Sequence, residues 1–461
     1  MGTVCSKTLG KSALLLTGIH SFSDVAQARP ETSFDYAGPM PPAADPASAD
    51  RGQLPARRRR PRNRRTLIIR AAAHAFSERG YHGVSMEEIA AEVGISAPAL
   101  YRHFPGKYSL FLETALQLVQ ELLDATEDSA LPKPRHPGER LEQLLDAVIA
   151  VTQANRRTGS IYRHEGRYLT PADHALLWSR FDELTRRVLK PLREVHPELD
   201  PAAARFRAVG AFGMVGSITA HHTALSPGKT AALLHASALS VLDFPPVAGE
   251  SGIPAHTVRT PGIGIGASAQ HGVQPGTRRE LLLAQAVGLF YRRGYREVTI
   301  EEIGAAAGIT ASAVYRHFRG KSALLLQACQ LAAHRLDAAT REALAAGSGP
   351  RDSLEALIHA YVVHTFAHHE LMSVYFADVL NLSVEEQSQL RRLQRQHIGI
   401  WVDLVAAQVP GLGTPEVRFL VHGALNMVAD LGRFTRFDQS PPNLERTTKV
   451  ILHALGAACA R

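Results

Sequence analysis

The sequence predicts an all-α protein built from two tandem copies of one helical unit. The first observation is an internal repeat: residues 64–113 align without a gap to residues 278–327, and about half of the aligned positions are identical. The second is helical periodicity, because apolar residues recur every three or four positions over most of the chain. The third is length, since 461 residues exceed what one hydrophobic core usually organises.

The repeat continues beyond the segment in which it is most obvious. Arg205-Phe206 matches Arg418-Phe419, and Met214-Val215 matches Met427-Val428, all at a shift one residue shorter than before. A whole protein was therefore duplicated. We predict six segments: a disordered tail (1–56), a first short helical domain (57–108), a first larger helical domain (109–244), a linker (245–276), a second short helical domain (277–322) and a second larger helical domain (323–461).

Composition narrows the class of protein. The net charge of +8 makes a polyanionic partner plausible. The three cysteines lie far apart, which argues against a disulfide framework and fits a reducing, cytoplasmic location. No apolar run approaches the ~18 residues that span a membrane. The first 28 residues faintly resemble a secretory signal, but a disordered or over-extended start is the preferred interpretation.

Each repeat opens with a pattern typical of a helix-turn-helix. A first helix of about 15 residues, with Leu67, Ala71 or Ala72, and Phe76 at core spacing, ends at Gly80. Ser85 then caps a short helix, Gly94-Ile95 makes a tight turn, and Ser96 caps a second short helix that ends at Phe104. Two short helices around a glycine turn are characteristic of this DNA-binding motif.

Helical geometry predicts which residues of the second short helix face outward. Ala97, Leu100 and Phe104 share one face and are expected in the core, whereas Pro98 and Arg102 point away from it. Tyr101 lies on the flank, where a core role and a DNA-facing role are both open, and we favour the second. Small residues followed by basic and hydrogen-bonding ones suit a helix that enters the major groove.

Arg57 to Arg65 carries seven arginines in nine positions. This basic arm is either a solvated charge run or a contact to phosphates or the minor groove.

Both segments resemble the helix-turn-helix domain of the TetR (tetracycline-repressor-like) family. The resemblance rests on Gly94-Ile95-Ser96, Leu100-Tyr101-Arg102-His103-Phe104, Lys107 and their second-repeat counterparts. It implies phosphate contacts from the tyrosine, histidine and lysine, and base contacts from the start of the recognition helix. The predicted DNA-binding residues are Ser85, Ser96, Ala97, Pro98, Ala99, Tyr101, Arg102, His103 and Lys107, and in the second repeat Thr299, Thr310, Ala311, Ser312, Ala313, Tyr315, Arg316, His317 and Lys321.

The larger half of each repeat has no strong motif. The family resemblance implies a helical domain that binds a small-molecule effector and pairs through its last two helices. Candidate pocket residues are Tyr162, Glu165, Tyr375 and Asp378, for which surface or capping roles are the alternative. His364 and His368 lie one helical turn apart but lack a third ligand, so no metal site or cofactor is expected.

The sequence therefore predicts a sequence-specific, DNA-binding transcriptional regulator, most simply a repressor of a double-stranded DNA operator. The two glycine-lysine-serine triplets lack the earlier glycine of a phosphate loop, and no catalytic signature appears, so an enzyme is not expected. The alternative is a non-specific architectural DNA-binding protein, which would not need two large apolar domains. The two repeats are expected to pair with each other within one chain, and a homodimer of chains is the other possibility.

Overall fold

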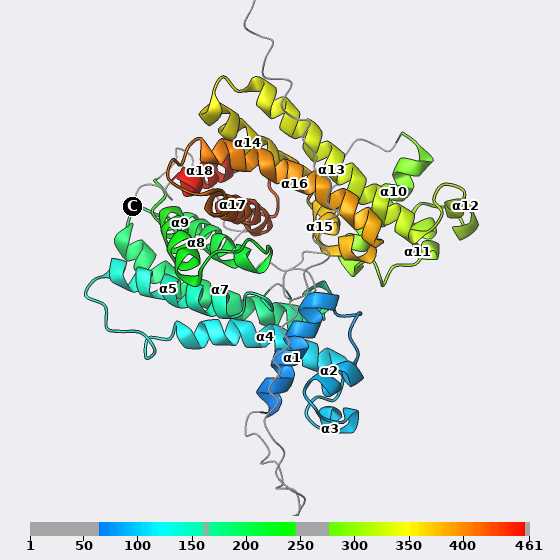
Figure 1. Cartoon of the computed structure of the whole chain (residues 1–461), viewed down its shortest axis with the longest axis horizontal. Coiled ribbons are helices and arrows are strands. Elements are labelled where there is room, and N and C mark those ends of the chain that lie inside the picture. The colour runs from blue at the N-terminus through cyan, green and yellow to red at the C-terminus, as the bar shows by residue number, and fades with distance from the viewer. Residues whose placement is uncertain (1–63, 160, 162–165, 246–275, 457–461) are drawn as a thin grey trace, which may run out of the picture. The chain divides into compact units, whose positions relative to one another are not determined.

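The computed structural model describes residues 64–159, 161, 166–245 and 276–456, and the regular elements in these ranges are all helices (Figure 1). The first repeat contains α1 (Arg64–Arg79), α2 (Met86–Glu92), α3 (Ala97–Tyr101), α4 (Lys107–Ala125), α5 (Pro137–Ala154), η1 (Gly166–Tyr168), α7 (Pro171–Val195), α8 (Pro201–Gly216), η2 (Ser217–Thr219) and α9 (Pro227–Leu242). The second contains α10 (Arg278–Arg293), α11 (Ile300–Ala306), α12 (Ala311–Tyr315), α13 (Lys321–Ala346), α14 (Pro350–Ala367), α15 (His369–Asp378), η5 (Val379–Asn381), α16 (Val384–Ala406), α17 (Thr414–Phe434) and α18 (Pro441–Gly456). The predicted all-α fold is confirmed. The predicted tail and most of the basic arm and linker lie outside the described residues.

Proline fixes where many of the long helices begin. Pro137, Pro171, Pro201 and Pro227 each occupy the first position of a helix in the first repeat. Proline is well suited to this position because its φ angle is already helical and its missing N–H would have no partner there. Each of these prolines therefore marks the start of a new helix.

The first helix of each repeat packs its DNA-binding domain together. In α1 the buried residues include Ile68, Ala72 and Phe76, whereas Leu67 is 46% exposed. The expectation that Leu67 belongs to the core is therefore wrong by one position. Ile68 takes this place, four residues before Ala72. Three adjacent aliphatic residues fit the helical periodicity about equally well, so the packing of the helix decides which of them is buried.

The last two helices of each repeat meet at the centre of the described structure (Figure 1). Helix α8 packs against α17, and α9 packs against α18. A Cβ built on Gly210 would lie 3.5 Å from the Sδ atom of Met427, and a Cβ on Gly423 would overlap the Sδ atom of Met214. Gly210 and Gly423 are matching positions of the two repeats, as are the two methionines, so the contact has the reciprocal character of a twofold interface.

Aromatic pairs repeat this pseudo-twofold relation. Phe206 lies 6.4 Å from Phe434, centroid to centroid, and the matching pair Phe419 and His221 lies at 5.2 Å. At the edge of the contact, the ammonium of Lys229 donates to the carboxylate of Glu416 at 2.6 Å. The centre of the bundle is therefore apolar and aromatic, with charges at its rim.

In the part of the chain that the structure describes, no helix is both long and apolar enough to cross a membrane.

Candidate nucleic-acid interface and ligand cavity

An ion pair links the helix-turn-helix of each repeat to the first helix of its domain, beside their shared apolar core. Ser85 caps α2, and Glu88 returns the bond to the Ser85 backbone N–H, forming a capping box. The same Glu88 accepts a hydrogen bond from Arg79 at 2.9 Å. Because these contacts favour the ionised carboxylate, with the Ser85 bond the largest cause, the pKa of Glu88 is lowered. The second repeat reproduces this arrangement with Thr299, Glu302 and Arg293.

A glycine shapes the turn between the two short helices. Gly94 has a φ angle of +65° and Gly308 has one of +68°. This left-handed conformation strains residues that carry a Cβ, so the turn requires glycine here. The tight turn that the sequence predicts is confirmed in both repeats.

The recognition helices expose the residues that the sequence places outward. Leu100 and Phe104 are buried, and Tyr101 is 45% exposed. Pro98, Arg102 and His103 are also exposed. The helix itself ends at Tyr101 and not at Phe104, and Ser96 makes no side-chain cap, so both of these details of the prediction are wrong.

The second recognition helix repeats the surface with small differences. Tyr315 is 54% exposed and Arg316 is exposed, but His317 is partly buried. Thr310 caps α12 by accepting a bond from the Ala313 N–H, and its hydroxyl lies 3.0 Å from the Ser312 hydroxyl. The two DNA-reading helix-turn-helix domains (the readers) therefore differ most at the start of the recognition helix, where the first carries Pro98.

The lysine that begins α4 or α13 contacts an aromatic ring of its own DNA-binding domain. The Nζ atom of Lys107 lies 4.7 Å from the ring centroid of Tyr81. Lys321 has the same relation to Tyr295 at 4.5 Å, and its Nζ also donates to the carbonyl of Val298 at 2.8 Å. Burial lowers the pKa of both lysines. Each lysine therefore has a cation–π partner inside its own domain, and its contact with phosphate stays a prediction.

Two of the four predicted pocket residues, Tyr375 and Asp378, lie in the described ranges, and neither is among the residues that line the first-repeat cavity. Tyr162 and Glu165 lie outside the described residues. Tyr375 and Asp378 are buried, and Asp378 accepts two hydrogen bonds from Arg167 of the first repeat, at 2.6 and 3.1 Å. Burial raises the pKa of Asp378, and the guanidinium of Arg167 opposes that rise. These residues form a buried contact between the repeats.

His364 and His368 lie one helical turn apart at the end of α14. The rings of His364 and His368 lie 4.9 Å apart. Across the described ranges, no three His, Cys, Asp or Glu side chains are grouped so that they could hold a metal ion.

One cavity of the described structure lies in the first repeat and has a volume of about 130 Å³. Its walls come from α4, α5, α7 and α8, and one side is closed by α17 of the second repeat. The lining is mainly apolar and aromatic, with two arginines and two aspartates among it: Leu118, Leu122, Val148, Thr152, Trp178, Phe181, Asp182, Leu184, Thr185, Arg205, Val209, Phe212, Gly213, Val215, Gly216, Thr219, Asp430, Arg433 and Phe434. A partly open, mainly apolar cavity with a few polar groups is typical of a small-molecule site.

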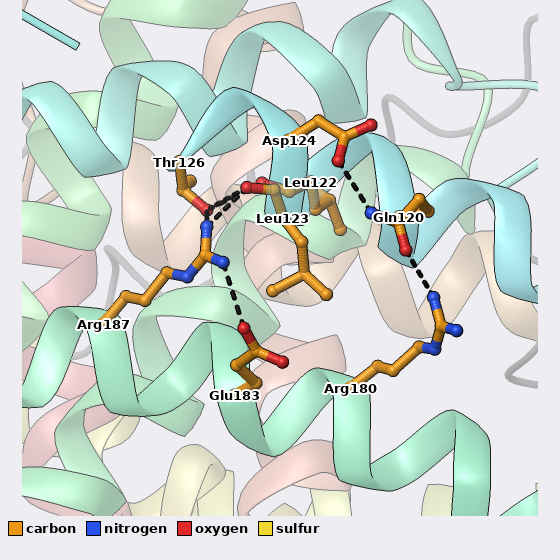
Figure 2. Close-up of polar contacts among 8 residues, drawn as sticks. All are labelled: Gln120, Leu122, Leu123, Asp124, Thr126, Arg180, Glu183 and Arg187. Atoms are coloured by element: carbon orange, nitrogen blue, oxygen red, sulfur yellow. Dashed lines mark hydrogen bonds and ion pairs between the residues drawn. The ribbon is translucent and has the colours of Figure 1, made fainter. Parts of the chain in front are cut away.

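Helix α4 joins this cavity to the first DNA-binding domain. It packs against α1 and is tied to α7 by polar contacts from two arginines (Figure 2). Arg187 donates to the Leu123 carbonyl and, at 3.0 Å, to the Thr126 hydroxyl, while Arg180 donates to the Gln120 side chain. The helix that carries Leu118 and Leu122 into the cavity is therefore fixed to α7 along its length.

Two segments, residues 68–114 and 282–328, match the family model described as bacterial regulatory proteins, tetR family. Both helix-turn-helix domains of the chain are therefore of the TetR type. The two matches coincide with the two helix-turn-helix regions, so the tandem duplication predicted from the sequence consists of two TetR-type units.

Several known proteins are similar to parts of this chain. The transcriptional repressor KstR2 of Rhodococcus jostii is 31% identical over 29% of this chain and 65% of its own length. The nucleoid occlusion factor SlmA of Vibrio vulnificus is 29% identical over 29% of this chain and 66% of its own length. The transcriptional activator FasR of Mycolicibacterium smegmatis is 37% identical over 19% of this chain and 39% of its own length. The chain thus spans just under two thirds of the length of the first two relatives.

Solved structures of TetR-type proteins also match. A TetR-family transcriptional regulator from Bordetella parapertussis aligns over 38% of this chain and 94% of its own, with 18% identity and a TM-score of 0.36. The ketosteroid transcriptional regulator KstR2 of Mycobacterium tuberculosis aligns over 39% and 95%, with 22% identity and a TM-score of 0.34.

Proposed function

We propose that this TetR-type chain is a sequence-specific, DNA-binding transcriptional regulator that represses by occupying a double-stranded DNA operator. The observation that carries the proposal is the outward face of the recognition helix, which occurs twice in one chain. Both α3 and α12 end in an exposed tyrosine that is followed by an exposed arginine, whereas Leu100 or Val314 is buried beneath them. An exposed face of this kind on a short helix is what major-groove reading requires.

Each exposed residue has a proposed part in binding. The small residues at the start of α3 and α12 bring the backbone close to base edges, and Arg102 and Arg316 reach guanine in the major groove. Tyr101, Tyr315 and the neighbouring histidines donate to phosphates, which adds affinity without sequence preference. Ser85 and Thr299 lie at the N-termini of α2 and α11, where backbone N–H groups favour a phosphate.

We place both readers of one chain on one operator. The support is the contact of α8 and α9 with α17 and α18, which joins the repeats through matching surfaces. About 30 residues join the two repeats, and a chain of that length can reach at most about 100 Å when fully extended, which is enough to permit this pairing. Tethering raises the local concentration of the second repeat to the order of millimolar, which favours pairing within the chain over pairing between chains.

A small-molecule effector in the first-repeat cavity would control DNA binding. The support is the position of α4, which contributes Leu118 and Leu122 to the cavity and packs on α1 of the first reader. A ligand that binds better to one arrangement of α4 than to another shifts the population of reader geometries. The first reader is then held in a position that matches its half-site poorly.

Selection of bound sequences from random DNA by the purified full-length chain tests the proposal. We expect a recovered motif with two related half-sites about one helical turn apart, centre to centre, because two recognition helices must reach the same side of the duplex. Binding that depends on salt but enriches no motif would overturn the proposal in favour of the non-specific, architectural DNA-binding protein.

A further inference from the structure

The two repeats differ in the interior that surrounds the cavity. At a shift of 213 residues, Val148 and Leu184, which line the cavity, correspond to Tyr361 and His397. In the second repeat the Tyr361 ring stacks on His397 at 5.9 Å and meets Trp401 edge-on at 5.6 Å, centroid to centroid. Trp401 is fully buried and Tyr361 is 4% exposed. Three rings therefore occupy the interior where the first repeat has smaller aliphatic side chains.

The outer wall of the cavity differs between the repeats as well. Trp178 and Phe181 of α7 line the cavity and are half-buried. Their counterparts on α16 are Arg391 and Gln394, both exposed to solvent. The second repeat thus lacks the aromatic wall that closes the cavity of the first, and its corresponding helix face is polar.

The charged groups of the cavity are paired with each other. Arg205 donates to Asp182 at 2.6 Å, and Arg433 is bonded to Asp430. Asp430 also accepts a bond from Asn426 at 3.1 Å. Two positive and two negative side chains give the cavity a net charge of zero. A charged ligand would have to displace one partner of a pair and leave the displaced charge half-buried and unpaired, which is unfavourable in free energy.

We propose that the chain binds one effector molecule, in the first repeat only, and that this ligand is small, uncharged and mainly apolar. The inference deepens the effector role proposed above, on which it rests. Asp430, Arg433 and Phe434 of α17 close the cavity from the second repeat, so the ligand contacts both repeats at once. The two repeats therefore have different roles. The first binds the ligand, and the second, whose own interior is filled by aromatic rings, contributes part of the cavity wall.

Calorimetric titration of the full chain without DNA tests the proposal, using benzyl alcohol, benzoate and benzylammonium as matched probes. A cavity of about 130 Å³ suits a single ring, since an engineered apolar cavity of similar size binds benzene. We expect saturable binding of one benzyl alcohol per chain, and at least about tenfold weaker binding of the two charged probes. Two molecules bound per chain, equal binding of a charged probe, or no saturable binding of benzyl alcohol would each overturn the proposal.

Two substitutions locate the bound probe. Val148→Tyr places in the first repeat the ring that Tyr361 supplies in the second, and it should abolish binding, whereas the control Tyr361→Phe should not. Trp178 and Trp401 are the two tryptophans of the chain, so Trp178→Phe should remove the change in tryptophan emission on binding, even if Val148→Tyr fails to fold. An emission change that persists in Trp178→Phe would place the ligand near Trp401 and refute the assignment. Because no DNA is present, failure here leaves the random-DNA selection as a separate test of regulator function.

Discussion

Gly423→Ala is expected to destabilise the protein, although alanine is normally the better residue inside a helix. Gly423 lies within α17, where it faces α8 of the first repeat. An added Cβ would overlap the Sδ atom of Met214, which is fully buried and has little room to withdraw. The substitution therefore measures how closely the two repeats approach.

The magnitude follows from two opposing contributions. Replacing a helical glycine by alanine stabilises by about 0.5–1 kcal/mol when nothing else changes. Forcing an extra methyl group into a packed interior costs about 1–3 kcal/mol. The matched control is Gly399→Ala in α16, where a new Cβ meets no atom within 4 Å. We expect the control to gain stability and Gly423→Ala to lose roughly 1 kcal/mol.

Urea unfolding followed by circular dichroism at equal protein concentrations measures both variants. In a Met214→Ala background the loss caused by Gly423→Ala should disappear, because the sulfur that the new methyl group meets is gone. If Gly423→Ala stabilises as much as Gly399→Ala does, α8 and α17 do not pack as described, and the pairing of the repeats is refuted.

Three further predictions address DNA reading and pH. Tyr101→Phe should weaken binding to all sequences alike, whereas Arg102→Ala should change which sequence is selected, and a uniform loss from Arg102→Ala in competition assays would contradict this division. Pro98→Ser should make the selected site more symmetric, since the second reader carries Ser312 there; an unchanged motif counts against it. Burial lowers the pKa of His221 to about 3 and that of His422 to about 4, and their rings stack at 4.6 Å across the repeats. The unfolded chain takes up protons at these residues below about pH 6.5 while the folded chain does not, so the free energy of unfolding should fall from pH 6.5 to 4 by on the order of 1 kcal/mol per unit for each imidazole. A flat pH profile of urea unfolding would refute this.

The helix-turn-helix could be predicted almost completely from the sequence. Its turn needs a left-handed glycine, its first helix needs a serine or threonine cap, and its recognition helix alternates buried and exposed positions within five residues. Each of these depends on neighbours in the chain. The error at Leu67 arose because three adjacent aliphatic residues fit the same periodicity, and only packing selects among them.

The cavity could not be located in this way. Its walls are apolar residues at ordinary helical spacing, which cannot be told from core residues until the helices are packed together. Polar residues that lie close in the sequence were the available signal, and they pointed to Asp378, which instead pairs with Arg167 more than 200 positions away. A comparison of the two repeats with each other held a better signal, because Val148 and Tyr361 differ greatly in size at matching positions.

The pairing of the two repeats within one chain is tested most directly by the mass of the free protein in solution. Light scattering at micromolar concentration should give about 50 kDa, the mass of one chain, because each repeat already has its partner. The mass should not rise as the protein is concentrated through the micromolar range. About twice that mass would mean that the chains pair with each other, and it would contradict the single-chain arrangement of two readers.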